Sequence, residues 1–140
     1  MRVLILGAGL SGRGAALLMH QQGHDVTLAN QGPFDTSQYE ALGIQCVFSD
    51  DQSVNDGNYD VFIKAPGIPD RHPLVQSFQK HSNEIEWAAV YSPDYRYYCI
   101  SGTNGKTTAT TLLHKMLCHH DEKALLAGNV GIALSQKVYE

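Results

Sequence analysis

The run Val3-Leu4-Ile5-Leu6, followed at once by Gly7-Ala8-Gly9-Leu10-Ser11-Gly12, decides how the rest of the sequence is interpreted. The four apolar residues predict a buried strand, and the helical spacing of apolar residues after the glycines predicts a helix over 11–22. A G-x-G-x-x-G turn placed between a strand and a helix is typical of nucleotide-binding α/β proteins.

Each glycine of this first turn has a separate expected role. Gly7 permits the tight turn, Gly9 lets a ligand approach the backbone, and Gly12 lets the helix pack closely on the strand. The free N–H groups at the helix start favour an anion such as a phosphate or diphosphate. The alternative is that the glycines serve only the turn and the packing.

Further along the chain, short β-rich runs alternate with helix-like stretches. Strands are expected over 25–29, 44–48 and 59–64. This alternation favours a Rossmann-like α/β fold, a parallel sheet with flanking helices.

A second unit is expected after the Ser92-Pro93-Asp94 turn, with a strand over 97–101, a helix over 107–118 and a strand-like run over 124–127. We therefore divide the chain into a ligand-binding domain over 1–92 and an incomplete P-loop domain over 93–140.

Composition narrows the class of protein. The 140 residues carry a net charge of −4, which gives no basic surface to gather nucleic acid or an anionic membrane. The scattered cysteines Cys46, Cys99 and Cys118 suit a reducing compartment, and no run is long enough for a membrane span. The cytoplasm is the expected location. The oligomeric state is left open.

Two polar features lie where ligands bind in open α/β sheets. Asn30 ends the second strand, where an NAD site normally has Asp or Glu, so the nicotinamide interpretation is weakened. Its amide suits a uracil edge or a ribose, and equally a turn. Lys64-Ala65-Pro66-Gly67-Ile68-Pro69 offers Gly67 at the end of the fourth strand, although such a run alone is more often a rigid turn.

The most specific motif is Gly102-Thr103-Asn104-Gly105-Lys106-Thr107-Thr108. It resembles a P-loop with two residues, not four, between its glycines. Backbone N–H groups would ring a phosphate of ATP, Lys106 would hold the β- and γ-phosphates, and Thr107 would coordinate Mg²⁺. Thr108 would support the helix start. The alternative is a capped helix with a solvated lysine.

Together the two glycine turns resemble the Mur ligase family. The similar segments are Gly7–Gly12, Ala65–Ile68, Glu84–Glu86, Ile100–Thr111 and Gly128–Gly131, so the resemblance runs from end to end and is strongest to the D-glutamate-adding members.

This resemblance implies peptidoglycan precursor synthesis. ATP would phosphorylate the terminal carboxylate of UDP-N-acetylmuramoyl-L-alanine, and D-glutamate would attack the acyl phosphate. Lys106 and Thr107 would serve phosphoryl transfer. The family's uracil-binding acid falls on Asn30, its diphosphate contacts on Leu10 and Ser11, and a further substrate contact on Asn129. Asn30 and Lys64 depart from the usual Asp and small residue.

The resemblance implies that the family's acidic magnesium ligand, modified lysine, adenine pocket and C-terminal domain lie beyond these residues, so the 140-residue chain alone is expected not to ligate. His114 and the His119-His120 pair are interpreted as surface residues. The rival functions are another Mur ligase, a nicotinamide-dependent oxidoreductase, which leaves the P-loop unexplained, and a non-catalytic nucleotide-binding regulator.

Overall fold

The computed structural model describes residues 1–120, 123–128 and 131–140. Its centre is a sheet of four parallel strands in the order β3-β2-β1-β4. The strands are β1 (Arg2–Leu6), β2 (Asp25–Ala29), β3 (Gln45–Val47) and β4 (Val61–Lys64). The predicted parallel sheet is confirmed, and its first strand lies in the interior with β2 and β4 on either side.

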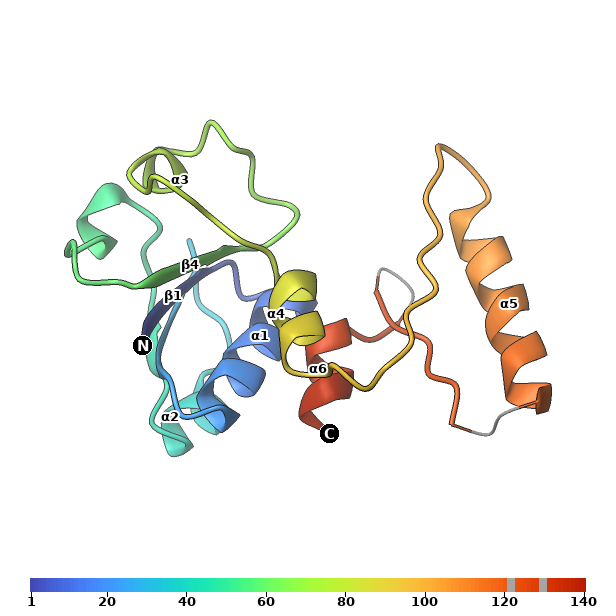
Figure 1. Ribbon diagram of the computed structural model, residues 1–140. Helices are drawn as coiled ribbons and strands as arrows, with labels where there is room; N and C mark the ends of the chain where they lie inside the picture. The colour runs from blue at the N-terminus through green and yellow to red at the C-terminus, as the bar shows by residue number, and fades with distance from the viewer. Residues whose placement is uncertain (121–122, 129–130) are drawn as a thin grey trace.

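Helices cover both faces of this sheet (Figure 1). Helix α1 packs below β1 and β2, and α4 and α6 lie beside α1. The helices are α1 (Leu10–Gln21), α2 (Ser37–Ala41), α3 (Pro73–Gln76), α4 (Glu84–Val90), α5 (Lys106–His120) and α6 (Leu134–Tyr139), with a 3-10 turn η1 (Gln52–Val54).

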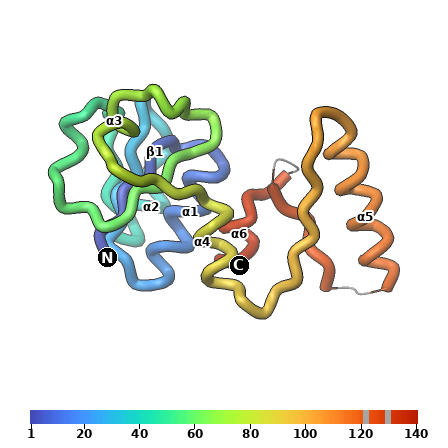
Figure 2. Tube along the Cα trace, turned by 45° about the horizontal axis from the view of Figure 1, so that its top comes forward, coloured from blue at the N-terminus to red at the C-terminus, as the bar shows by residue number. Residues whose placement is uncertain are grey.

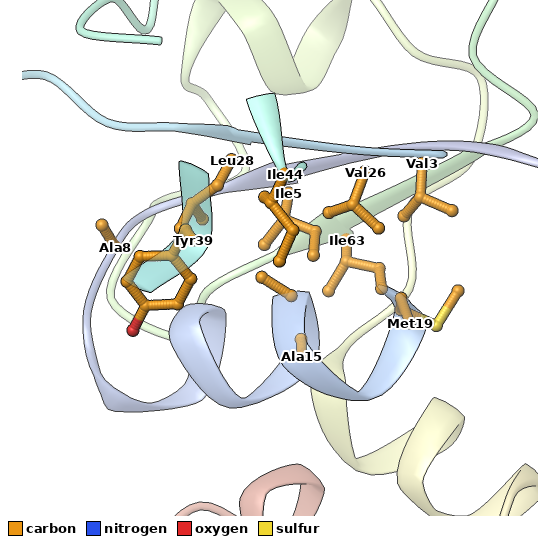
Figure 3. Packing of buried hydrophobic residues seen from close by; sticks show 11 residues of the cluster. Val3, Ile5, Ala8, Ala15, Met19, Val26, Leu28, Tyr39, Ile44 and Ile63 are labelled. Carbon is orange, nitrogen blue, oxygen red and sulfur yellow. The ribbon is translucent and has the colours of Figure 1, made fainter. Parts of the chain in front are cut away.

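The core follows from the alternation of side chains along β1. Val3 and Ile5 belong to one buried cluster with α1, whereas Leu4 and Leu6 belong to a second cluster on the opposite face. Figure 3 shows the first cluster, in which Val3, Ile5, Val26 and other strand residues meet the α1 helix. Because β1 is buried on both faces, its uninterrupted apolar run is explained.

The segment beyond residue 92 differs from the prediction in its strands. The helix expected over 107–118 is present as α5, but 97–101 and 124–127 form no strand. Both strand predictions were wrong, because a strand needs a neighbour for its backbone hydrogen bonds and the described residues offer these segments none.

Helix α5 stands apart from the sheet in both views, whereas α6 returns to pack on α1 and α4 (Figures 1 and 2). None of the α5 residues is buried. Within the described part of the chain, no helix has the length and apolar character needed to cross a membrane.

Candidate functional site

The first glycine turn connects β1 to α1 and is tightly packed. Gly7 has a φ of 101°, and its N–H donates to the Ala29 carbonyl at 2.8 Å. A Cβ on Gly7 would lie 2.8 Å from Ala65 Cβ, and a Cβ on Gly12 would lie 1.8 Å from the Gly7 carbonyl oxygen. Both positions therefore require glycine for the fold itself.

Gly9 differs from these two glycines. Its φ of −74° is open to any residue, and a Cβ there would meet nothing within 4 Å. The first helical bond of α1 runs from Arg13 N to the Gly9 carbonyl, and no side chain caps the helix. The N–H groups of Leu10, Ser11 and Gly12 consequently have no partner within the helix, and those of Leu10 and Ser11, which are not buried, are available to an anion.

Asn30 joins the glycine turn to the end of β2. Its Oδ1 accepts from Ala8 N at 3.0 Å, and its Nδ2 donates to the Gly32 carbonyl at 3.0 Å. A carboxylate could make the first of these bonds but not the second. Asn30 therefore stabilises the turn. One lone pair on its Oδ1 and one N–H on its Nδ2 remain for a ligand.

A cleft of about 480 Å³ opens beside Asn30 at the carboxyl ends of the strands. It adjoins a second hollow of about 560 Å³, and Gln31, Asp50 and His72 line both. The first cleft is lined by Leu6, Gly7, Asn30, Gln31, Gly32, Asp50, Ile68, Pro69 and His72. Ligands bind at this edge in open α/β sheets.

Asp50 and His72 form the most defined polar pair of the cleft. His72 Nε2 lies 3.0 Å from Asp50 Oδ2, and among the described residues His72 Nδ1 is buried without a hydrogen-bond partner. Sequence reasoning missed Gln31, Asp50 and His72. Their positions shortly after β2, β3 and β4 are the signal that would have found them.

Lys64 holds the turn that carries Gly67. Its Nζ donates to the Ile68 carbonyl at 2.8 Å and pairs with Asp70 at 2.8 Å. The hydrogen bond from Lys64 to Asp70, and then the charge of Lys64, hold the pKa of Asp70 below its usual range. Gly67 is exposed on this turn, while Ile68 lines the cleft. The Lys64 ammonium group thus stabilises the turn.

The P-loop is an exposed backbone cradle before α5. Gly102 and Gly105 have φ values of 154° and 77°, and Lys106 Nζ donates to the carbonyls of Gly102 and Thr103. The first helical bond runs from Ala109 N to Gly105 O, so three earlier N–H groups have no helical partner. They belong to Lys106, Thr107 and Thr108.

The sites of the two turns are separate in this structure. None of the predicted ATP-binding residues lines the cleft beside Asn30. Asn129, predicted to contact the substrate, lies outside the described residues.

The chain is similar in sequence to several ligases named UDP-N-acetylmuramoylalanine–D-glutamate ligase. It is 34% identical to the protein from Leuconostoc mesenteroides over 99% of this chain and 33% of that protein. It is 36% identical to the protein from Bacillus subtilis over 97% of this chain and 32% of that protein. The chain spans about a third of the length of these curated relatives.

Solved structures share the fold. A ligase from Neisseria meningitides, for UDP-N-acetylmuramate and L-alanyl-gamma-D-glutamyl-meso-diaminopimelate, matches 94% of this chain and 45% of its own, with a TM-score of 0.60 at 20% identity. The UDP-N-acetylmuramate–alanine ligase of Thermotoga maritima matches 88% of this chain and 30% of its own, with a TM-score of 0.55 at 24% identity.

No family model matches the chain. The sequence relatives nevertheless make this chain a homologue of part of the UDP-N-acetylmuramoylalanine–D-glutamate ligases, and the solved ligases share its fold.

Proposed function

We propose that this chain binds a UDP-N-acetylmuramoyl precursor at the first glycine turn and ATP at the P-loop, as parts of a ligase that adds D-glutamate to UDP-N-acetylmuramoyl-L-alanine. The single observation that carries the proposal is the pair of helices that begin directly after glycine turns, α1 at Leu10, which no side chain caps, and α5 at Lys106. Both present N–H groups and a positive helix end to a phosphate.

At the first turn, the diphosphate would lie over Gly9 and accept from the N–H groups of Leu10 and Ser11. The open space above Gly9 suits this approach. The cleft beside Asn30 is lined by apolar and polar residues, one aspartate and one histidine, with no lysine or arginine among them, which suits a uracil and a ribose better than a second phosphate.

At the second turn, the residues fit the phosphates of ATP. The positive φ of Gly105 turns the backbone into α5, and the N–H groups from Lys106 to Thr108 lie at the positive end of this 15-residue helix. Lys106 Nζ, now on the loop carbonyls, would move to the β- and γ-phosphates. The exposed Thr107 hydroxyl would supply one oxygen ligand to Mg²⁺.

The reaction that these sites would serve is an acyl transfer. The substrate carboxylate attacks the γ-phosphorus of ATP and ADP leaves; the amine of D-glutamate then attacks the acyl carbon, and phosphate leaves with formation of the amide. The chain's contribution is to hold the phosphates and to offset the negative charge that develops during phosphoryl transfer, through Lys106 and the backbone N–H groups.

A calorimetric titration of the 140-residue chain tests the proposal. UDP-N-acetylmuramoyl-L-alanine and Mg²⁺–ATP should each bind, and NADPH should not. Lys106→Ala should weaken ATP at least about tenfold, because a charge-assisted contact is lost, and leave the UDP precursor unaffected. The matched variant Lys115→Ala, on the same helix away from the loop, should bind both ligands like the wild type.

Binding of NADPH without the UDP precursor would overturn the proposal in favour of an oxidoreductase. Equal ATP affinity of the Lys106 and Lys115 variants would contradict the proposal that the P-loop binds ATP.

A further inference from the structure

The carboxylate of Glu84 is buried at the contact between α4 and α6. Glu84 is the first residue of α4 and its side chain is only 4% exposed. Its Oε1 accepts from the backbone N–H of Ser135 at 2.6 Å, across 51 positions of the chain. A buried carboxylate is costly unless it is hydrogen-bonded, so this contact is expected to matter.

Glu84 is not needed to start its own helix. Asn83 caps α4 by accepting from Glu86 N at 3.0 Å, and Asn83 Nδ2 donates to the exposed Glu86 carboxylate at 2.7 Å. The N-cap of α4 is therefore supplied by Asn83, and Glu86 supports the Asn83 side chain. The Glu84 carboxylate is thereby left for another element.

The element that lacks a cap is α6. Its N-cap residue is Ala133, which has no side-chain acceptor, and Ser135 is the second residue of the helix. An N-cap side chain ordinarily accepts from this N–H. Glu84, on α4, thus accepts the hydrogen bond that the N-cap residue of α6 cannot accept. Its negative charge also lies at the positive, N-terminal end of α6.

Helix α1 also holds this end of α6. A Cβ on Gly14 would lie 2.5 Å from Ser135 Oγ and 3.1 Å from Gln136 N, so a larger residue here would displace the Ser135 hydroxyl and push the α6 backbone away by a few tenths of an ångström. At the other end, Gln21 Nε2 donates to the Tyr139 carbonyl at 3.2 Å. Figure 1 shows α6 seated beside α1 and α4, while the P-loop and α5 form the excursion between α4 and α6.

We propose that Glu84 is a positioning residue for the ligase reaction: by capping α6, it fixes the return of the segment that carries the P-loop relative to the first glycine turn. This inference rests on the proposed function for its catalytic consequence. The excursion from α4 to α6 contains all of Gly102–Thr108 and ends in the turn before α6. A loosened α6 would let phosphate donor and acceptor carboxylate drift apart.

The capping contact is tested first by hydrogen exchange on the 140-residue chain. Glu84→Ala should speed exchange of the Ser135 amide at least about tenfold and leave the β1 amides unchanged, because only the local opening is altered. Glu84→Gln keeps an acceptor oxygen and should stay close to the wild type. Glu86→Ala, an equal deletion at the exposed carboxylate of the same helix, is the matched control. Unchanged exchange in Glu84→Ala overturns the capping role.

The catalytic consequence is tested by the kinetics of the ligase that carries these residues. Glu84→Ala should lower kcat about ten- to a hundredfold, as small misplacements of reacting groups do, with little change in KM for the UDP precursor. Gly14→Ala should lower kcat in the same way without touching Glu84, since its methyl group displaces Ser135. Glu84→Gln and Glu86→Ala should keep near wild-type kcat.

Loss of activity in Glu84→Ala but not in Gly14→Ala, or an unchanged kcat in both, overturns the positioning role. A wild-type protein without ligase activity would instead overturn the proposed function, and the exchange experiment would still decide whether Glu84 caps α6.

Discussion

At the scale of single residues, the glycines of the first turn fall into those that the packing requires and those that leave space for a ligand. Gly12 leaves no room for a methyl group, because its Cβ would lie 1.8 Å from a backbone oxygen, whereas Gly9 faces open space. The glycines of this motif therefore differ in physical role: Gly12 is required by the packing of the fold, whereas Gly9 leaves space for a ligand. Asn30 shows the same division, since its amide ties Ala8 to Gly32 before any ligand arrives.

These two glycines give opposite expectations on substitution to alanine. Gly12→Ala should destabilise the fold by about 1–3 kcal/mol or more through overpacking. Gly9→Ala should change the free energy of unfolding by less than about 0.5 kcal/mol, yet weaken the UDP precursor about tenfold by placing a methyl group where the diphosphate approaches. Urea unfolding and calorimetric titration of both variants measure the two effects. Wild-type affinity in Gly9→Ala would mean that the ligand does not approach over this residue.

At the scale of elements, α4 is docked on the α1–β2 connection by a pair of partly buried rings. His24 Nε2 lies 2.6 Å from the Tyr91 hydroxyl, and Trp87 stacks on Tyr91. Burial, and then the charge of the N-terminus, lowers the pKa of His24, and burial raises the pKa of Tyr91. The folded state thus prefers a neutral His24.

The lowered pKa of His24 predicts a loss of stability in mild acid. The unfolded chain, with an ordinary histidine pKa of about 6.5, binds a proton before the folded chain does. The contribution of His24 is complete above that pH and is lost as the pH falls through the interval down to the folded pKa. Urea unfolding at pH 7.5 and pH 5.0 should show a smaller free energy of unfolding at the lower pH, and His24→Gln should reduce this difference. An unchanged difference in His24→Gln would assign it to other groups.

The elements also show what the sequence could predict and what it could not. The runs 3–6 and 25–29 became strands within one residue of the expected bounds, because apolar runs beside a glycine turn leave few alternatives. The runs 97–101 and 124–127 have similar local composition but no neighbouring strand, and a pattern along the chain does not show whether a partner exists.

The candidate site divides in the same way. Its glycine turns could be predicted from the sequence, because such turns need glycine at fixed spacing. Gln31, Asp50 and His72 could not be predicted in this way, since they come from the segments that follow different strands and meet only through the strand order β3-β2-β1-β4.

At the scale of the whole molecule, apolar packing stabilises some parts of the 140-residue chain much more than others. The sheet and its helices enclose two apolar clusters, whereas Leu112 and Met116 of α5 are 59% and 58% exposed. Figure 2 shows α5 set apart from the rest of the chain. Helical stability in proteins comes mostly from packing of an apolar face, and isolated helices of this length are marginal in water.

Helix α5 should therefore be the least protected of the two long helices in this chain. Its amides are expected to exchange at least about a hundredfold faster than those of α1, because α1 opens only with the core and α5 opens by itself. Saturating Mg²⁺–ATP should slow exchange in the first turn of α5, since ligand binding stabilises the state that binds it, and Lys106→Ala should remove this protection. Exchange read by mass spectrometry on peptides from α1 and α5 makes the comparison within one sample. Equal protection of both helices without nucleotide would mean that α5 is packed against a surface, and the exposure of Leu112 and Met116 would then not describe the chain in solution.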